Sequence, residues 1–113
     1  MHIINRTRGV ALAREVRLAD TWCARFKGLM GKKKINPGEG LVLVPCNSVH
    51  TCFMRFAIDV VFVNAYGRVL KLYHALAPYR LTVIVKGAAQ VIELPAGTVR
   101  QSGTQVGDLV ELE

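Results

Sequence analysis

The residues best suited to chemistry gather in Cys46-Asn47-Ser48-Val49-His50-Thr51-Cys52, which places two thiols around one imidazole. In an extended strand, positions 46, 50 and 52 face the same side because their separations are even. Thiolate and imidazole are ligands that zinc prefers, but a closed site needs four of them. No CxxC or HxxxH pair supplies the remaining ligand, so the fold would have to bring His2, His74 or Cys23 next to the segment. We therefore expect buried thiols and a hydrogen-bonded histidine rather than a metal site.

The same segment permits a catalytic interpretation, with Cys46 as nucleophile, His50 as base and Asp59 as the group that orients the base. Nucleophilic catalysis needs an activated thiolate and a site that stabilises an oxyanion. The sequence shows no glycine-rich turn that would present Cys46. A disulfide between Cys46 and Cys52 would require an oxidising environment.

Asp59 is the second candidate because it stands inside the apolar run Ile58-Asp59-Val60-Val61-Phe62-Val63. A carboxylate in such a run is costly unless it is paired or multiply hydrogen-bonded. It must lie at a strand end, cap backbone N–H groups of a loop, or meet a cation. Arg25 and Arg55 are the nearest suitable partners, and a buried Arg–Asp pair that fixes the fold is the favoured expectation.

Glu93 is likewise a carboxylate within an apolar run, Val91-Ile92-Glu93-Leu94-Pro95, and it needs a partner for the same reason. If Asp59 and Glu93 faced one cavity, each would raise the pKa of the other and they would form an acid/base pair. We therefore predict a candidate binding pocket formed by Arg25, His50, Asp59 and Glu93. Arg25 would hold an anionic group through a forked hydrogen-bond pair, and His50 would change charge near neutral pH.

Length and composition indicate one domain over residues 1–113, with 51% hydrophobic and 20% charged residues. No apolar run approaches the roughly 18 to 20 residues of a membrane helix, and the N-terminus lacks the features of a secretory signal. Together with three scattered cysteines, this predicts a cytoplasmic protein. No Walker loop, GxGxxG or EF-hand pattern is present, so we expect no cofactor.

The net charge of +7 comes entirely from the first third of the chain. Residues 1–34 hold nine Lys or Arg against two acidic residues, whereas residues 35–113 hold six of each sign. Such a field can attract nucleic acid, anionic lipid or acidic protein, although it is more often a solvated face. No motif supports nucleic-acid binding.

Hydrophobic periodicity predicts mostly short strands and one helix. The helix spans residues 20–30, with Asp20 as N-cap, Gly31 as its end, and an apolar stripe that leaves Arg25 at its margin. Expected strands are 2–5, 10–18 with an interruption at Arg14, 41–44, 49–54, 58–63, 69–76, 81–85, 91–94 and 109–112. Residues 64–67 should form a hairpin turn, and 95–97 should break the chain. These elements predict a mainly β fold, a small barrel or rolled and largely antiparallel sheet, with α+β as the alternative.

Several sequence blocks occur together in an order that is specific although each is weak alone. They are Arg25-Phe26-Lys27-Gly28-Leu29-Met30-Gly31, Gly38-Glu39-Gly40-Leu41, residues 49–63, Gly67-Arg68-Val69, Glu93-Leu94-Pro95-Ala96-Gly97 and Gly107-Asp108. Through these blocks, residues 10–112 resemble the uncharacterised family called domain of unknown function 192. The resemblance implies a compact β-rich domain and no established activity, cofactor or ligand.

The leading hypothesis is a small binding or accessory domain with a polar pocket for a small or anionic group. A hydrolase-like enzyme could use the same four residues for general acid/base chemistry. The third alternative is a basic nucleic-acid-binding domain that works through residues 1–34.

Overall fold

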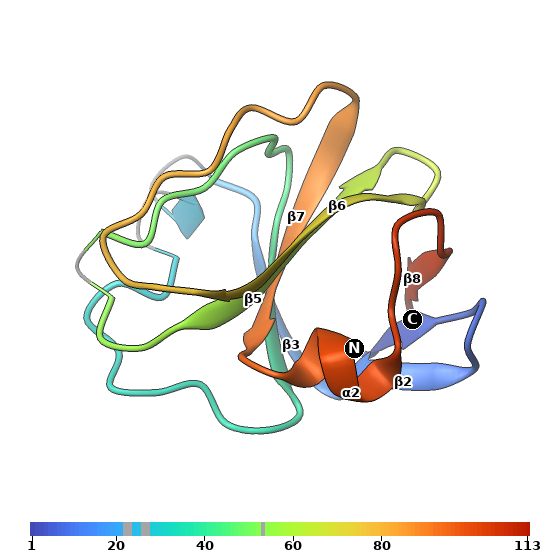
Figure 1. Cartoon of the computed structure of the whole chain (residues 1–113), viewed down its shortest axis with the longest axis horizontal. Helices are drawn as coiled ribbons and strands as arrows, with labels where there is room; N and C mark the ends of the chain where they lie inside the picture. Colours follow the sequence, from blue (N-terminus) through green and yellow to red (C-terminus); the bar gives the residue numbers. More distant parts are fainter. Residues whose placement is uncertain (22–23, 26–27, 53) are drawn as a thin grey trace.

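The computed structural model describes residues 1–21, 24–25, 28–52 and 54–113, and it consists mainly of strands in two sheets (Figure 1). The strands are β1 (Ile3–Asn5), β2 (Val10–Ala13), β3 (Glu15–Ala19), β4 (Glu39–Leu43), β5 (Ile58–Asn64), β6 (Val69–Leu76), β7 (Ala88–Pro95) and β8 (Val110–Leu112). One short helix, α2 (Thr98–Ser102), follows β7. Among the described residues, no helix is long and apolar enough to cross a bilayer.

The larger sheet has the strand order β3-β4-β7-β5-β6, and the smaller has β2-β1-β8. Among the described strands, only the β3–β4 pair is parallel, and every other pair is antiparallel. In the larger sheet, Leu41 pairs with Glu93 and Glu93 pairs with Val60. Because directly paired residues point to the same side of a sheet, this register decides which face each side chain joins.

The core consists of two hydrophobic clusters, one on each face of the larger sheet. The first lies between the two sheets and α2, and contains Ile3, Leu12, Ala13, Val42, Val61, Val63, Val69, Ile92, Leu94, Val99 and Val110. The second lies on the opposite face and contains Ala19, Leu29, Leu41, Leu43, Val49, Met54, Ile58, Val60, Phe62, Val85 and Val91. Residues of β5 are therefore buried on both sides of the sheet, which explains why this strand is apolar on both faces apart from Asp59.

The irregular segments 45–57 and 77–87 cover the second cluster, and they occupy the left of the view in Figure 1. Two threonines hold the segments together. Buried Thr51 donates its hydroxyl to the carbonyl of Ala77 and accepts the N–H of Arg80 at 2.7 Å. Buried Thr82 accepts the N–H of Val49 at 2.9 Å. Hydroxyl–backbone bonds thus replace a continuous strand ladder here.

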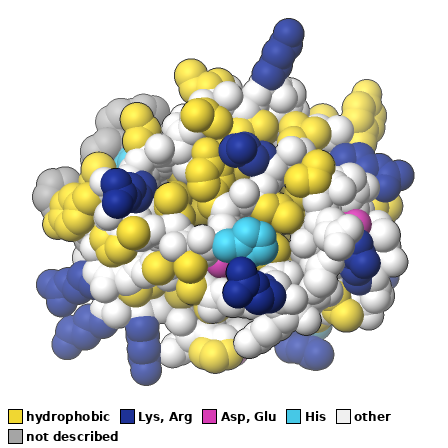
Figure 2. Space-filling view, viewed as in Figure 1, with side chains coloured by type: hydrophobic (Ala, Val, Ile, Leu, Met, Phe, Trp, Pro, Cys, Tyr) yellow, Lys and Arg dark blue, Asp and Glu magenta, His cyan; other side chains and the backbone are white. Residues whose placement is uncertain are grey.

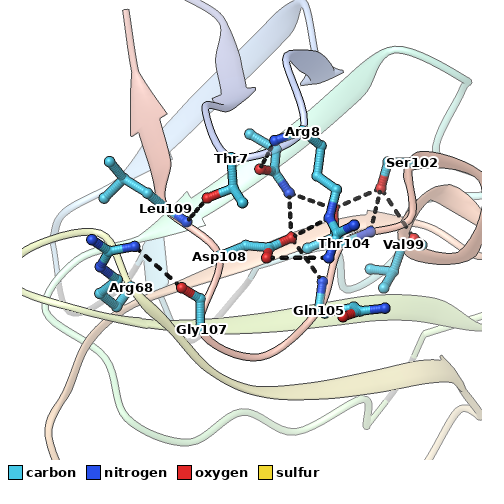
Figure 3. A network of polar contacts seen from close by, with 11 residues as sticks. Thr7, Arg8, Arg68, Val99, Ser102, Thr104, Gln105, Gly107, Asp108 and Leu109 are labelled. Carbon is cyan, nitrogen blue, oxygen red and sulfur yellow. Dashed lines mark hydrogen bonds and ion pairs between the residues drawn. The ribbon is translucent and has the colours of Figure 1, made fainter.

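A polar network joins the small sheet to the turn before β8 (Figure 3). Asp108 accepts hydrogen bonds from Asn5 Nδ2 at 3.0 Å, from Arg8 Nε at 2.9 Å and from the N–H of Gln105 at 3.0 Å. Asn5 Nδ2 also donates to Thr104. The Arg8 guanidinium and these N–H donors lower the pKa of Asp108 to about 2.

The prediction of a mainly β, largely antiparallel fold is confirmed. Strand expectations are confirmed at seven of the nine ranges, including the interruption at Arg14 that separates β2 from β3. The hairpin turn at 64–67 is also confirmed, with Gly67 at a φ of 88°. Helix α2 was not predicted, because five residues between Gly97 and Gly103 carry no helical periodicity.

Two predicted strands, 49–54 and 81–85, are wrong. The described residues of both ranges are irregular, and among them a single bridge between His50 and Leu81 is what remains of strand pairing. Their β-like composition reflects side chains such as Val49 and Val85 that are buried from loops.

The helix predicted at 20–30 falls partly on residues outside the described ones, which include Trp22, Cys23 and Phe26 of its apolar stripe. Ala24 and Arg25 are helical, and Thr21 rather than Asp20 caps the turn by accepting the N–H of Ala24. Residues 28–30 form a turn, with Gly28 already at a φ of 47°.

Candidate functional site

Asp59 is fully buried and satisfied by backbone N–H groups. Its Oδ1 accepts the N–H of Ala75 at 2.8 Å, and its Oδ2 accepts those of Gly97 at 3.1 Å and Val99 at 2.8 Å. Because Gly97 is the N-cap position of α2 and carries no side chain, Asp59 supplies the cap from β5. The expected Arg–Asp pair is wrong, and capping of loop N–H groups, one of the other two placements expected for Asp59, is what occurs.

Asp59 and Glu93 lie on opposite faces of the larger sheet. Asp59 pairs with Leu94 of the first cluster, whereas Glu93 pairs with Val60 of the second. The suggested acid/base pair of Asp59 and Glu93 is therefore wrong, and Asp59 does not line the cavity described next. Strand register separates these two carboxylates although they lie on neighbouring strands.

The other three predicted residues, Arg25, His50 and Glu93, line one cavity of about 350 Å³ beside the second cluster. Its apolar wall is formed by Leu29, Met30, Leu43, Val49 and Met54, and its remaining lining by Gly28, Cys46 and Ser48. This volume is in the range of small-molecule sites. Another hollow of about 420 Å³ over β3 and β4 has charged side chains that are exposed, except for half-buried Glu39.

Glu93 is the most unusual group in this cavity. It is 2% exposed, and among the described residues nothing forms a hydrogen bond with its Oε1. Burial raises the pKa of Glu93 to about 8, although the positive charge of Arg17 opposes the shift. Glu93 is therefore protonated at neutral pH and can donate a hydrogen bond as well as accept one.

Arg25 reaches the cavity from the helical turn at residues 24–25. Its Nη1 donates to the carbonyl oxygens of Asp20 at 3.0 Å and Val44 at 3.1 Å. These two bonds fix the guanidinium in place, and its Nε and Nη2 groups have no hydrogen-bond partner among the described residues. Arg25 thus retains donors suited to an anionic group.

His50 accepts the N–H of Cys52 on its Nδ1 at 3.2 Å. In the neutral imidazole the proton must then be on Nε2. His50 is half-buried and lies in the segment that Thr82 and Thr51 hold against residues 77–87.

Cys46 does not have the surroundings of a nucleophile. Its thiol donates to the carbonyl of Ser48 at 3.0 Å, and burial raises its pKa, with a further contribution from Glu93. A reactive cysteine needs a lowered pKa. Since Asp59 is on the other face of the sheet, the interpretation of Cys46, His50 and Asp59 as a catalytic triad is wrong.

Cys46 and Cys52 are both free thiols. Within the described part of the chain, no three His, Cys, Asp or Glu side chains are placed to hold a metal ion.

Sequence reasoning missed Gly28, whose backbone closes the cavity beside Glu93. A Cβ atom at Gly28 would lie 3.6 Å from Glu93 Oε1, and the φ of 47° favours glycine. The Gly28 carbonyl also accepts Arg17 Nη2 at 3.1 Å, which brings that cation toward Glu93. The only sequence signal for this role was the position of Gly28 within the Arg25–Gly31 block.

The basic first third of the chain is partly neutralised by the C-terminal residues. Arg6 pairs with Glu111 and Glu113, and Arg8 pairs with Asp108. Of the eight cations that the structure describes in residues 1–34, two are thus paired with carboxylates.

Comparisons with known proteins agree with this fold. The family model DUF192, described as an uncharacterised ACR, matches residues 3–112. A UPF0127 protein of Pyrococcus furiosus is 38% identical, over 96% of each chain, and one of Thermococcus kodakarensis is 37% identical, over 96% of this chain and 71% of that protein. A crystal structure of a protein of unknown function from Novosphingobium aromaticivorans aligns with a TM-score of 0.88 at 23% identity, covering 99% of this chain and 84% of that one. The chain belongs to the DUF192 family.

Proposed function

We propose that this chain is a binding domain for a small molecule that has an anionic or hydrogen-bond-accepting group on an apolar body. The observation that carries the proposal is Glu93, a buried carboxyl group with an unsatisfied Oε1 at the side of a cavity. A buried polar group without a partner destabilises a fold, so its presence in a pocket indicates a binding or catalytic site.

The polar groups around the cavity are mainly donors. Protonated Glu93 and the Arg25 guanidinium both offer hydrogens. A ligand that presents acceptor oxygens, such as a carboxylate or phosphate, complements this set. The apolar wall around Leu43 and Met54 would contact the rest of the ligand.

The test is a titration of the isotope-labelled chain with hexanoate, followed by amide chemical shifts, and with hexanol as the uncharged comparison. Hexanoate should shift the amides around the cavity, and Arg25→Gln should weaken this binding about tenfold or more. Arg14→Gln removes an exposed cation outside the cavity and should leave binding unchanged. Equal shifts with hexanoate and hexanol, or shifts in neither titration, would contradict an acceptor-binding pocket.

General acid catalysis is the second candidate, favoured by the raised pKa of Glu93 alone. An acid of this kind could protonate the leaving oxygen of a bound ester or phosphoester while water attacks the carbonyl carbon or the phosphorus. Hydrolysis of alkyl esters and alkyl phosphates, whose leaving groups need a proton, that is lost in Glu93→Gln would support an enzyme. Equal hydrolysis rates in the unsubstituted chain and in Glu93→Gln would contradict the enzyme and favour the binding role.

A cytoplasmic location is part of the proposal. The free thiols of Cys46 and Cys52 support a reducing compartment. The small or anionic ligand is the partner proposed for the cavity.

A further inference from the structure

A cluster of large apolar side chains is exposed on the segment 77–87. Tyr79, Leu81, Val83 and Ile84 are 65%, 78%, 59% and 73% exposed. Single exposed apolar residues are common, but four within six positions form a contiguous feature of the kind that marks an interaction surface. We name these four residues the apolar loop.

Backbone anchoring holds the apolar loop outward. Thr82, between Leu81 and Val83, and Val85, directly after Ile84, are buried, and their N–H groups donate to the carbonyls of Val49 and Asn47 at 2.9 and 2.8 Å. With these two residues fixed inward, Leu81, Val83 and Ile84 must face solvent. The exposure is therefore built into the hydrogen bonding of the segment.

Cations surround the apolar loop. Arg80 and Lys86 are exposed within the same segment. Tyr73, whose hydroxyl accepts the N–H of Val83, lies beneath the ammonium group of Lys71 at 5.3 Å from its ring centre. Residues 60–92 contain four Lys or Arg and no acidic residue. In the upper left of Figure 2, where Figure 1 places this segment, hydrophobic and basic side chains are interspersed.

We propose that the apolar loop is a docking surface for an anionic lipid bilayer. Leu81, Val83 and Ile84 would enter the headgroup region, Tyr79 would lie at the boundary with water, and Arg80, Lys71 and Lys86 would contact lipid phosphates. The charge pattern favours this occupant, because each cation near an anionic bilayer adds to binding and no carboxylate of residues 60–92 opposes it. The cytoplasmic leaflet is the anionic one, in agreement with the proposed location.

The docking surface is separate from the cavity in its chemistry and in its residues. None of the four apolar-loop residues lines the cavity that contains Glu93. The two are nevertheless adjacent, since His50 bridges to Leu81 and Val49 bonds to Thr82. A bilayer-bound chain would therefore hold the cavity close to the lipid surface.

The test is sedimentation of the full chain with vesicles of phosphatidylcholine that contain about one third phosphatidylserine, compared with phosphatidylcholine alone. We expect binding to the anionic vesicles, weakened by high salt. The double substitution Leu81→Asn/Ile84→Asn should lower the partition coefficient about tenfold or more. Arg80→Gln/Lys86→Gln should lower it about fivefold for each cation.

Matched controls are available elsewhere on the surface. Tyr66→Asn removes an aromatic residue that is 85% exposed outside the apolar loop, and Lys33→Gln/Lys34→Gln removes two exposed cations. Both should bind as the unsubstituted chain does. The proposal is overturned if anionic vesicles bind no protein, if the controls weaken binding as much, or if light scattering shows that the apolar loop instead joins two copies of the chain.

Discussion

Asp59 and Glu93 are two carboxyl groups on neighbouring strands of one sheet, both excluded from water, yet their surroundings differ completely. Asp59 accepts three backbone N–H groups and fixes the start of α2. Glu93 has an oxygen that no described residue satisfies, and it lies beside a cavity. The first arrangement stabilises the fold, whereas the second destabilises it at neutral pH. Burial alone therefore does not identify a functional carboxylate; the supply of hydrogen bonds does.

The largest effect that tests this comparison is expected from Asp59→Ala. Three backbone N–H groups would lose a charged acceptor in a buried place, at a cost of about 4 kcal/mol in the free energy of unfolding. Urea denaturation measures the change, with Asp20→Ala at an exposed position as control. A loss below about 1 kcal/mol would mean that Asp59 is not the structural cap described here.

Glu93→Gln should act in the opposite direction and stabilise the chain at pH 7 by about 3 kcal/mol. Since the folded pKa of about 8 exceeds the ordinary value of 4.5, Glu93 favours folding fully below about pH 4.5 and loses that contribution as pH rises toward 8. The advantage of Glu93→Gln should consequently disappear near pH 4. Denaturation at both pH values checks this, with exposed Glu15→Gln as the matched control. A variant that is less stable at pH 7 would refute the unsatisfied state of Glu93.

Asp108 is a third carboxylate, and it resembles Asp59 because its oxygens accept several hydrogen bonds. Asp108→Asn should cost about 1–2 kcal/mol at pH 7. The pKa of about 2 lies below the ordinary 3.8, so this contribution is present above about pH 4 and is lost as pH falls toward 2. Acid unfolding curves should show a smaller decline in the variant than in the parent chain. Glu111→Gln, which removes an exposed partner of Arg6, should change the curve much less.

The smallest expected effect comes from Gly28→Ala, compared with Gly38→Ala. Both glycines have positive φ, so each substitution should cost about 1 kcal/mol through backbone strain. Only the Cβ at position 28 would approach Glu93, because nothing lies within 4 Å of a Cβ at position 38. Gly28→Ala alone should therefore alter hexanoate binding. If both variants bind alike, the cavity beside Glu93 is not the binding site.

Much of the fold could be predicted from the sequence because the strands of the larger sheet have clear limits. Apart from Asp59, the run 58–63 is apolar on both faces, and the turn at residues 64–67 is typical of hairpins. The segments 49–54 and 81–85 could not be assigned in this way. Their buried valines resemble strand residues, while the contacts of Thr51 and Thr82 that keep them irregular join positions about 30 residues apart.

Residue types were enough to predict three residues of the cavity, but the strand register that places Asp59 on the other face of the sheet could not be predicted. Arg25, His50 and Glu93 could be selected because charged or titratable groups beside apolar runs need partners. The placement of Asp59 depends on its pairing with Leu94, a long-range alignment that no local pattern encodes. A shift of one residue in this alignment would have brought Asp59 to the face of Glu93. The sequence could thus indicate which groups need partners but not on which side of the sheet they find them.

The position of β1 has a consequence for how the chain folds during synthesis. β1 contains residues 3–5 but lies between β2 and β8, and His2 exchanges backbone hydrogen bonds with Glu113. One edge of β1 thus pairs with residues more than 100 positions later in the sequence. Until β8 arrives, Ile3 lacks part of its cover, and the nascent chain keeps an unpaired strand edge open to other chains. We expect the five-stranded sheet to form first and the three-stranded sheet to close the fold once β8 has been synthesised.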